Sequence, residues 1–142
     1  MAPWLRPFVC VTIMEILFAS PPRSAVQWDV YFCASTRKGL ERNLTAGEIL
    51  AQMYAFKELY DIPFHSIVLM GAGEPLTNYE EVLHFIHLAN DPELLNISYR
   101  NITISTCGIV PQIYRLADEN IPITLAISLH APNDRIRNVL FL

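Results

Sequence analysis

The sequence predicts an α/β protein built on a parallel β-sheet. Strand-like and helix-like patterns alternate from about residue 30 onward, and this order is typical of consecutive βαβ units. Glycine and hydroxyl residues close the predicted strands, in "GAGEP", "STCG" and "SLHAP". The order allows a doubly wound sheet or a (β/α) barrel, and in both folds ligands gather at the carboxyl ends of the strands. The sequence therefore predicts a ligand site at that edge of the sheet.

The first two elements have clear boundaries. Thr45 and Glu48 have the spacing of a capping box, which predicts the start of a helix. Apolar residues then recur at helical spacing up to Tyr60, and Asp61 with Pro63 ends the helix. The apolar run "HSIVLMGAG" that follows is typical of a strand buried on both faces.

The later elements repeat this order. Asn78 is predicted to cap a second helix, with Glu81 at its third position, and "NDP" at 90–92 ends it. "NITISTCG" reads as a strand, and a helix follows with Pro111 in its first turn. "ITLAISLHAP" is the next strand, and Asn133 or the following aspartate is expected to cap the last helix of "NDRIRNVL".

Composition limits the class of protein. The chain has 142 residues, which suits one domain or part of a larger one, and 52% are hydrophobic, so disorder is not expected. The net charge is −4 and no Lys/Arg stripe appears, so an RNA substrate would need basic surface from elsewhere or a local patch. Three widely spaced cysteines, Cys10, Cys33 and Cys107, do not form a disulfide framework, which favours a reducing, cytoplasmic setting.

The apolar run at residues 8–19 is difficult to place. It resembles the hydrophobic region of a secretory signal, but it carries Glu15, follows a single basic residue and lacks a clear cleavage site. It is also too short to span a bilayer. The alternative, a buried strand or helix, is not well supported by the sequence either.

The loop "GAGEP" offers the first candidate residues. Gly73 lets the backbone approach a ligand closely, and Glu74 supplies a carboxylate that suits an ammonium group. Pro75 biases Glu74 toward an extended conformation. The alternative is a tight turn with a solvated glutamate.

Hydroxyl and imidazole groups follow the next two strands. Ser105 and Thr106 suit a carboxylate or a ribose, although both hydroxyls can equally satisfy local backbone groups. Ser128 and His130 lie two apart on a predicted strand, so they should share a face, with a structural histidine as the alternative. Cys107 is expected to be a small buried hydrophobe.

A pair of histidines has a spacing that can suit a metal. His84 and His87 lie three apart on the second predicted helix, but no carboxylate or cysteine partner lies near them in sequence. A solvated helix face is therefore favoured over a zinc site.

Four segments, "FCASTRKGLERNLTAGEI", "GAGEPLTNY", "NITISTCGIVP" and "LAISLHAPND", together resemble the radical S-adenosylmethionine enzymes that methylate C2 of adenine in 23S ribosomal RNA and transfer RNA. The resemblance runs from about Phe32 to Leu140. It implies an α/β fold of the partial (β/α) TIM-like barrel type, with the first half only, over residues 32–142. It also implies those two RNAs as partners, with no membrane association.

The resemblance implies two cofactors, a [4Fe–4S] cluster and S-adenosylmethionine. Such enzymes hold the cluster on three cysteines spaced C-x3-C-x2-C, since thiolates suit this soft metal. By position, Cys33 would be the third ligand, and Gly73 with Glu74 would receive the amino group of S-adenosylmethionine. The rest of that pocket would be lined by Ser105, Ser128, Leu129 and His130.

The departures from the family pattern concern catalysis. Val26 and Val30 occupy the first two cluster positions, and neither valine can ligate iron. The RNA-binding region and the segment with the methyl-carrying cysteine have no counterpart. We therefore expect a catalytically incomplete chain, assign no catalytic residue, and expect self-association through an exposed barrel edge. The alternatives are a non-catalytic S-adenosylmethionine-binding module, or a small exported or membrane-anchored protein that uses the apolar run.

A frame hypothesis accounts for the missing cysteines. Codons chosen for the segment from Ile13 to Val30 can be read one base out of step as Y-G-N-S-V-C-V-T-T-Q-I-G-C-P-M-G-C, which resembles the family's sequence before its third cysteine. The hypothesis is that residues 1–31 are an atypical, out-of-frame segment ahead of the partial core domain.

Overall fold

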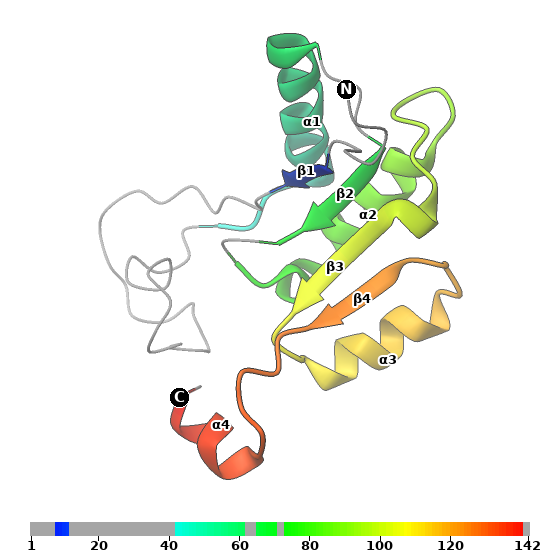
Figure 1. Ribbon diagram of the computed structural model, residues 1–142. Coiled ribbons are helices and arrows are strands. Elements are labelled where there is room, and N and C mark those ends of the chain that lie inside the picture. Colours follow the sequence, from blue (N-terminus) through cyan, green and yellow to red (C-terminus); the bar gives the residue numbers. More distant parts are fainter. Residues whose placement is uncertain (1–7, 12–41, 62–64, 71–72, 141–142) are drawn as a thin grey trace, which may run out of the picture.

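The protein has an α/β fold in which parallel strands alternate with helices (Figure 1). The computed structural model describes residues 8–11, 42–61, 65–70 and 73–140. Within these ranges the strands form one sheet in the order β1-β2-β3-β4, and every neighbouring pair is parallel. The strands are β1 Phe8–Val11, β2 Ser66–Leu69, β3 Ile102–Thr106 and β4 Thr124–Ile127. The predicted fold class is confirmed, and the described sheet is open, with β1 and β4 at its edges.

Helices connect the strands as βαβ units require. The helical elements are α1 Ala46–Tyr60, the 3₁₀ turn η2 Pro75–Asn78, α2 Tyr79–Asn90, the 3₁₀ turn η3 Tyr99–Asn101, α3 Val110–Asp118 and α4 Asp134–Leu140. Their boundaries agree with the predicted ones to within a few residues. Pro111 lies in the first turn of α3, and the side chain of Asn133 caps α4 by accepting a hydrogen bond from the N–H of Ile136 at 3.0 Å.

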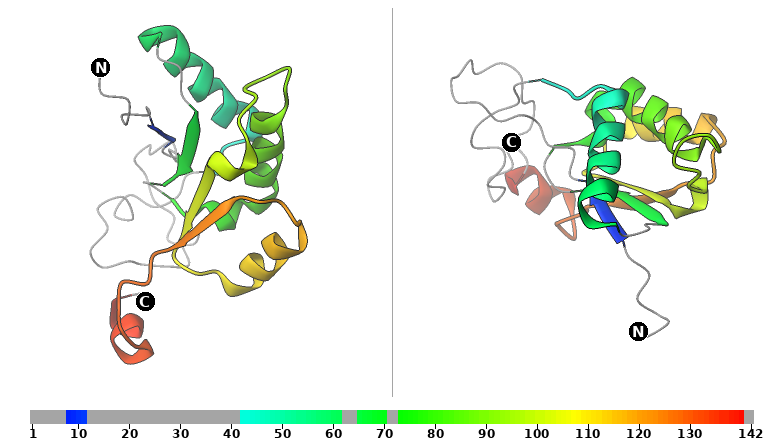
Figure 2. Two further views of the ribbon diagram at one scale, coloured as in Figure 1. Left: turned by 45° about the vertical axis from the view of Figure 1, so that its right-hand side comes forward. Right: turned by 90° about the horizontal axis from the view of Figure 1, so that it is seen from above.

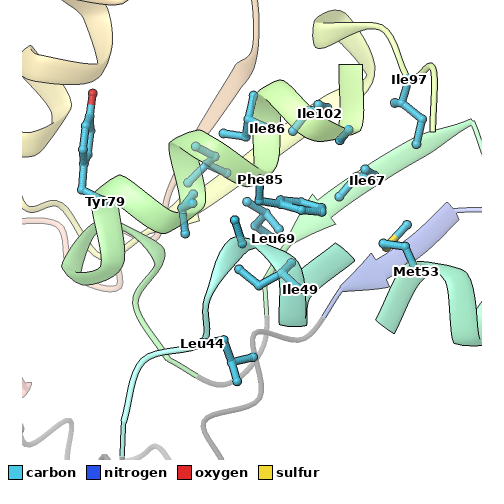
Figure 3. Packing of buried hydrophobic residues seen from close by; sticks show 14 of the residues in the cluster. Leu44, Ile49, Met53, Ile67, Leu69, Tyr79, Phe85, Ile86, Ile97 and Ile102 are labelled. Carbon is cyan, nitrogen blue, oxygen red and sulfur yellow. The ribbon is translucent and has the colours of Figure 1, made fainter. Parts of the chain in front are cut away.

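The hydrophobic core lies between the sheet and the helices α1, α2 and α3 (Figures 2 and 3). Burial alternates along β2 and β3, because successive residues of a strand face opposite sides. Three fully buried helix residues pack against the buried strand residues: Ile49 and Met53 of α1 and Phe85 of α2. The buried strand residues are Ile67, Leu69, Ile102 and Ile104.

The opposite face of the sheet is less covered. Val68 of β2 and Ser105 of β3 point to this side and are half-buried. The pairing of Ser105 with Ala126 places β4 in the same register, with Ala126 on this side as well. In a (β/α) barrel the face away from the helices is the interior, so Ser105 faces the interior side, next to the last residue of β3.

Helix α1 begins as predicted. The Thr45 side chain accepts a hydrogen bond from the N–H of Glu48 at 3.3 Å, and the Glu48 carboxylate accepts one from the N–H of Thr45 at 2.9 Å. The same carboxylate pairs with Arg42 at 2.6 Å. The Arg42 guanidinium, and then the Thr45 N–H, lower the pKa of Glu48 to about 2. Asp61 ends the helix with φ 47°, in the left-handed region.

The predicted cap of α2 is wrong. Asn78 is at the N-cap position, but its side chain does not cap the helix and is buried instead. Its Nδ2 donates to the backbone oxygen of Leu44 at 2.7 Å. Glu81 likewise accepts a hydrogen bond from the N–H of Ala46 at 2.7 Å, rather than serving a capping box. Both side chains thus hold the segment at the start of α1 in place. Each bonds a backbone group there, distant in sequence, instead of a backbone group at the start of its own helix.

A strand occupies part of the apolar run for which the sequence supported neither strand nor helix. Phe8–Val11 forms β1 and pairs in parallel with Ser66–Leu69 of β2. Four apolar residues with two valines suffice for a short strand on a sheet edge, and the periodicity of so short a run does not reveal it. The rest of the run, residues 12–19, lies outside the described residues.

Candidate ligand site at the carboxyl ends of the strands

The candidate site lies where β2, β3 and β4 end. The three strands are parallel neighbours, so the segments that follow them meet at one edge of the sheet (Figure 1). These segments are residues 73–74 after β2, 107–108 after β3 and 128–130 after β4. The predicted gathering of glycine, carboxylate and hydroxyl groups at this edge is confirmed for the described residues.

Gly73 and Glu74 shape the segment after β2. Gly73 has φ 88°, a conformation that favours glycine, and Glu74 is extended before Pro75 as expected. The Oε1 of Glu74 accepts a hydrogen bond from the N–H of Leu76 at 3.0 Å, which caps the turn η2. Glu74 is thus half-buried and held, and it is not the freely solvated glutamate of the alternative interpretation.

The second oxygen of Glu74 reaches the next strand. Its Oε2 accepts a hydrogen bond from the N–H of Cys107 at 2.7 Å. A carboxylate has about four lone-pair positions, and the two backbone N–H groups use two of them. The carboxylate can therefore accept further hydrogen bonds from an ammonium group while keeping its place.

The two hydroxyls that end β3 have different roles. Thr106 faces the helices, is almost fully buried, and its Oγ1 accepts a hydrogen bond from the N–H of Gly108 at 3.0 Å. Ser105 points to the opposite, half-buried face. The sequence could not separate the two, because the face of each depends on the register of β3 in the sheet. Of the pair, Ser105 is the one whose side chain is not buried under the helices.

Cys107 is half-buried beside Glu74. Burial raises the pKa of its thiol to about 12, and the nearby Glu74 carboxylate acts in the same direction. The thiol is therefore neutral at physiological pH, which agrees with the predicted role as a small hydrophobe and disfavours a nucleophile.

The segment after β4 departs from the predicted strand. β4 ends at Ile127, and the last bond to β3 runs from the N–H of Ser128 to the oxygen of Thr106 at 2.8 Å. His130 has φ 56°, in the left-handed region, so the chain turns there. The expectation that Ser128 and His130 share a strand face is therefore wrong, since the two-residue alternation holds only within a strand. Ser128 is half-buried, while Leu129 and His130 are exposed.

The sequence did not single out Arg137, which lies over this edge. Its Nη1 donates to the backbone oxygens of Leu129 at 2.7 Å and Ser128 at 3.3 Å, and its Nη2 donates to that of Cys107. The available signal was its position one helical turn after Asn133, the cap that follows the β4 segment. A side chain there can reach back over the strand ends.

The residues do not fit a three-cysteine iron–sulfur cluster. The positions that the cluster pattern requires hold Val26, Val30 and Cys33, and a valine side chain has no donor atom. All three lie outside the described residues. In the part of the chain that the structure describes, no three His, Cys, Asp or Glu side chains are grouped to hold a metal, and His87 bonds the hydroxyl of Tyr99 at 2.9 Å.

The family follows from a comparison with protein-family models. Residues 31–140 match the model of the radical SAM superfamily, and the chain belongs to that superfamily. The match begins just ahead of Cys33 and ends with α4, so it includes every strand-end segment of the candidate site.

Particular relatives narrow the comparison. The chain is 55% identical over 109 residues to the "Probable dual-specificity RNA methyltransferase RlmN" of Carboxydothermus hydrogenoformans. The aligned residues are 77% of this chain and 32% of the relative. It is 60% identical over 107 residues to the protein of the same name from Clostridium novyi, covering 75% and 31%. The chain thus spans about a third of the length of these curated relatives.

A solved structure agrees. The crystal structure of a radical SAM methyltransferase from Sphaerobacter thermophilus matches 94% of this chain and 37% of its own, with TM-score 0.79 and 40% identity. The prediction of an incomplete radical SAM barrel is confirmed. Among the described residues, no helix is both long and apolar enough to cross a membrane.

Proposed function

We propose that the chain is the first part of the S-adenosylmethionine-binding core of an RNA methyltransferase that acts on C2 of adenine in 23S ribosomal RNA and transfer RNA. The observation that carries the proposal is that Glu74, Ser105 and Ser128 lie at the carboxyl ends of three neighbouring parallel strands. The chain that holds them is 55–60% identical to proteins named as dual-specificity RNA methyltransferases. The proposed location is the reducing cytoplasm, which the absence of a disulfide framework from the sequence supports.

The proposed pocket assigns a contact to each strand end. The ammonium group of S-adenosylmethionine would bind at Gly73 and the Glu74 carboxylate, because the two backbone hydrogen bonds to that carboxylate do not use all of its lone-pair positions. Ser105 and Ser128 would offer hydroxyls to the rest of the cofactor, and Leu129 with His130 would close the pocket on the β4 side.

We also propose that this chain does not transfer methyl groups. Radical SAM enzymes use the open iron of a three-cysteine cluster to hold and cleave S-adenosylmethionine, and one cysteine cannot hold four irons. Without a cluster iron to hold it, S-adenosylmethionine should bind this chain only weakly. Anaerobic reconstitution with iron and sulfide should therefore leave the chain without a stable four-iron cluster, measured by iron content and absorption. Full cluster occupancy would contradict this part of the proposal.

Titration of ¹⁵N-labelled protein with S-adenosylmethionine tests the pocket, because chemical shifts report weak binding residue by residue. Saturable shifts are expected at residues 73–74, 105–108 and 128–130, and not at the turn of residues 91–96 at the far end of the sheet. Glu74→Ala should reduce the shifts, while Glu93→Ala, at an exposed glutamate in that far turn, should not. Absence of saturable shifts at the strand ends would refute the pocket.

The RNA partner is proposed for the whole methyltransferase rather than for this part alone. RNA binding rests on clustered basic side chains, and this chain has net charge −4 with 10 Lys and Arg against 14 Asp and Glu. The isolated chain should therefore show no salt-dependent binding to a ribosomal RNA fragment at physiological ionic strength. Tight binding would show that the chain carries an RNA surface of its own.

We further propose that the chain associates with a second copy of itself through β4. This strand is an edge of the described sheet, and Ile127 and Leu129 beside it are 55% and 61% exposed. An open apolar strand edge is a template for pairing. Sedimentation should show concentration-dependent dimers that Ile127→Lys removes, whereas Glu93→Lys should not; a monomer at all concentrations would overturn this proposal.

A further inference from the structure

We propose that Arg137 is a positioning residue that fixes the segments after β3 and β4 relative to each other, and so sets the shape of the ligand pocket between them. The inference rests on the proposed function, in which these segments hold S-adenosylmethionine. No motif of the sequence marked Arg137, and its side chain donates to backbone oxygens of the pocket, those of Cys107, Ser128 and Leu129, rather than to the side chains proposed to contact the ligand.

The contacts of Arg137 begin where the strand pairing stops. The ladder between β3 and β4 ends with the bond from the N–H of Ser128 to the oxygen of Thr106 at 2.8 Å. Beyond it, the Arg137 guanidinium donates to the oxygen of Cys107 on one side and to those of Ser128 and Leu129 on the other. One side chain thus continues the connection between the two segments.

An arginine suits this role for geometric reasons. Its planar guanidinium carries five N–H donors in a rigid fork, and three backbone carbonyls offer only acceptors. The turn at Gly108 packs directly beside it, since a β-carbon placed there would lie 3.7 Å from Nη2. A lysine keeps the charge but donates from a single point, so it cannot span two segments in the same way.

The position of Arg137 is itself fixed by the start of α4. The Asn133 side chain caps the helix, and the backbone oxygen of Asn133 accepts a hydrogen bond from the N–H of Arg137 at 3.0 Å. The Leu129 oxygen that receives Nη1 also accepts the N–H of Ala131 at 2.7 Å, in the turn where His130 has positive φ. Both ends of the contact are therefore held by local structure.

The contact also links the segment after β4 to Glu74. The peptide groups of Cys107 are bonded on both sides, since its N–H donates to Glu74 and its oxygen accepts from Arg137. A single residue thus connects the carboxylate proposed for the ammonium group to the guanidinium over β4. Loss of Arg137 is expected to loosen both segments without disturbing the core between α1 and α2.

Hydrogen exchange on the full chain tests the inference without any ligand. The variants are Arg137→Ala and Arg137→Lys, with Arg135→Ala as the matched control, because Arg135 is an exposed arginine of the same helix. In Arg137→Ala, amides of 105–110 and 127–131 should exchange about tenfold faster or more, the size expected from losing hydrogen bonds to a charged donor. Amides of α2 should not change, which separates a local effect from general destabilisation. In Arg137→Lys, the exchange rates of the same two segments should lie between those of the wild type and those of Arg137→Ala.

Equal exchange in the alanine variants at positions 135 and 137 would overturn the inference. If Arg137→Ala does not fold, the lysine variant decides: faster exchange confined to the two segments supports the role, and wild-type exchange refutes it. In the titration with S-adenosylmethionine, the affinity of Arg137→Ala should then be at least about tenfold lower than that of the wild type. The affinity of Arg135→Ala should equal that of the wild type. If the wild-type chain does not bind S-adenosylmethionine, the proposed function fails, while hydrogen exchange still decides the role of Arg137.

Discussion

The Glu74 carboxylate and the backbone N–H of Cys107 form a hydrogen bond of 2.7 Å that joins the segments after β2 and β3. The residues are 33 positions apart in sequence, so the bond depends on the parallel pairing of the two strands. It places a charged group at the center of the candidate site and holds it there before any ligand arrives.

Glu74→Gln should destabilise the fold and disturb this edge of the sheet. The amide has only one oxygen, so it cannot accept from both the Leu76 and Cys107 N–H groups, and its NH₂ would face one of them. The expected loss is about 1–3 kcal/mol in the free energy of unfolding, measured in urea. Glu93→Gln, at an exposed site, serves as the control. Equal stability of the two variants would mean that the Glu74 contacts contribute little.

The Cys107 thiol should resist alkylation in the folded protein. Burial, followed by Glu74, raises its pKa from 9.0 to about 12. Because the pKa is higher in the folded than in the unfolded state, the thiol's contribution to stability is complete below pH 9 and is lost as the pH rises toward 12. Mass spectrometry of the Cys107 peptide should show slow reaction with iodoacetamide at pH 9 and rapid reaction in urea. Rapid reaction of the folded protein at pH 9 would contradict the raised pKa.

Helix α1 should lose support in acid through Glu48. Arg42, and then the Thr45 N–H, lower its pKa from 4.5 to about 2, so its contribution to stability is present above pH 4.5 and is lost as the pH falls toward 2. Glu48→Gln should therefore lower stability at pH 7 and flatten its decrease between pH 4.5 and 2. Glu58→Gln, on an exposed site of the same helix, should keep the wild-type profile. Parallel profiles for wild type and Glu48→Gln would argue against the lowered pKa.

Asn78→Asp should destabilise the junction between α1 and α2. The aspartate has nearly the same shape, but it replaces the Nδ2 donor with an acceptor that faces the Leu44 oxygen in a buried position. The cost should be about 1–3 kcal/mol in the free energy of unfolding. Asn101→Asp, at an exposed asparagine, should change stability far less. The idea fails if both substitutions have the same effect in thermal or urea unfolding.

Local sequence signals predicted most of the fold. The capping box of Thr45 and Glu48, the Pro111 start of α3 and the end of β3 just before Gly108 depend on neighbours within a few residues, and the structure confirms them. The cap assigned to Asn78 failed because its partner, Leu44, is 34 residues away. β1 was missed because four residues carry too little periodicity to separate a strand from other apolar runs.

The location of the candidate site was predictable from the sequence, but its hydrogen bonds and side-chain orientations were not. Parallel strands fix the edge at which Glu74, Ser105 and Ser128 gather, and the sequence sufficed for that. Which hydroxyl faces the open side depends on the register of β3, and the reach of Arg137 depends on the turn at His130. The assignment of Cys33 and the frame hypothesis for residues 1–31 concern positions largely outside the described residues and stay predictions, which sequencing of the coding DNA can test.

The short turn η2 also works as a spacer of fixed length. At its two ends, Glu74 reaches Cys107 and Asn78 reaches Leu44, so one turn of four residues registers the ligand edge against the start of α1. Each residue of a 3₁₀ turn rotates the chain by about 120°, so inserting or deleting one would aim only one of the two side chains at its partner. This loop should therefore accept changes of side chain at exposed Thr77 far better than any change in its number of residues.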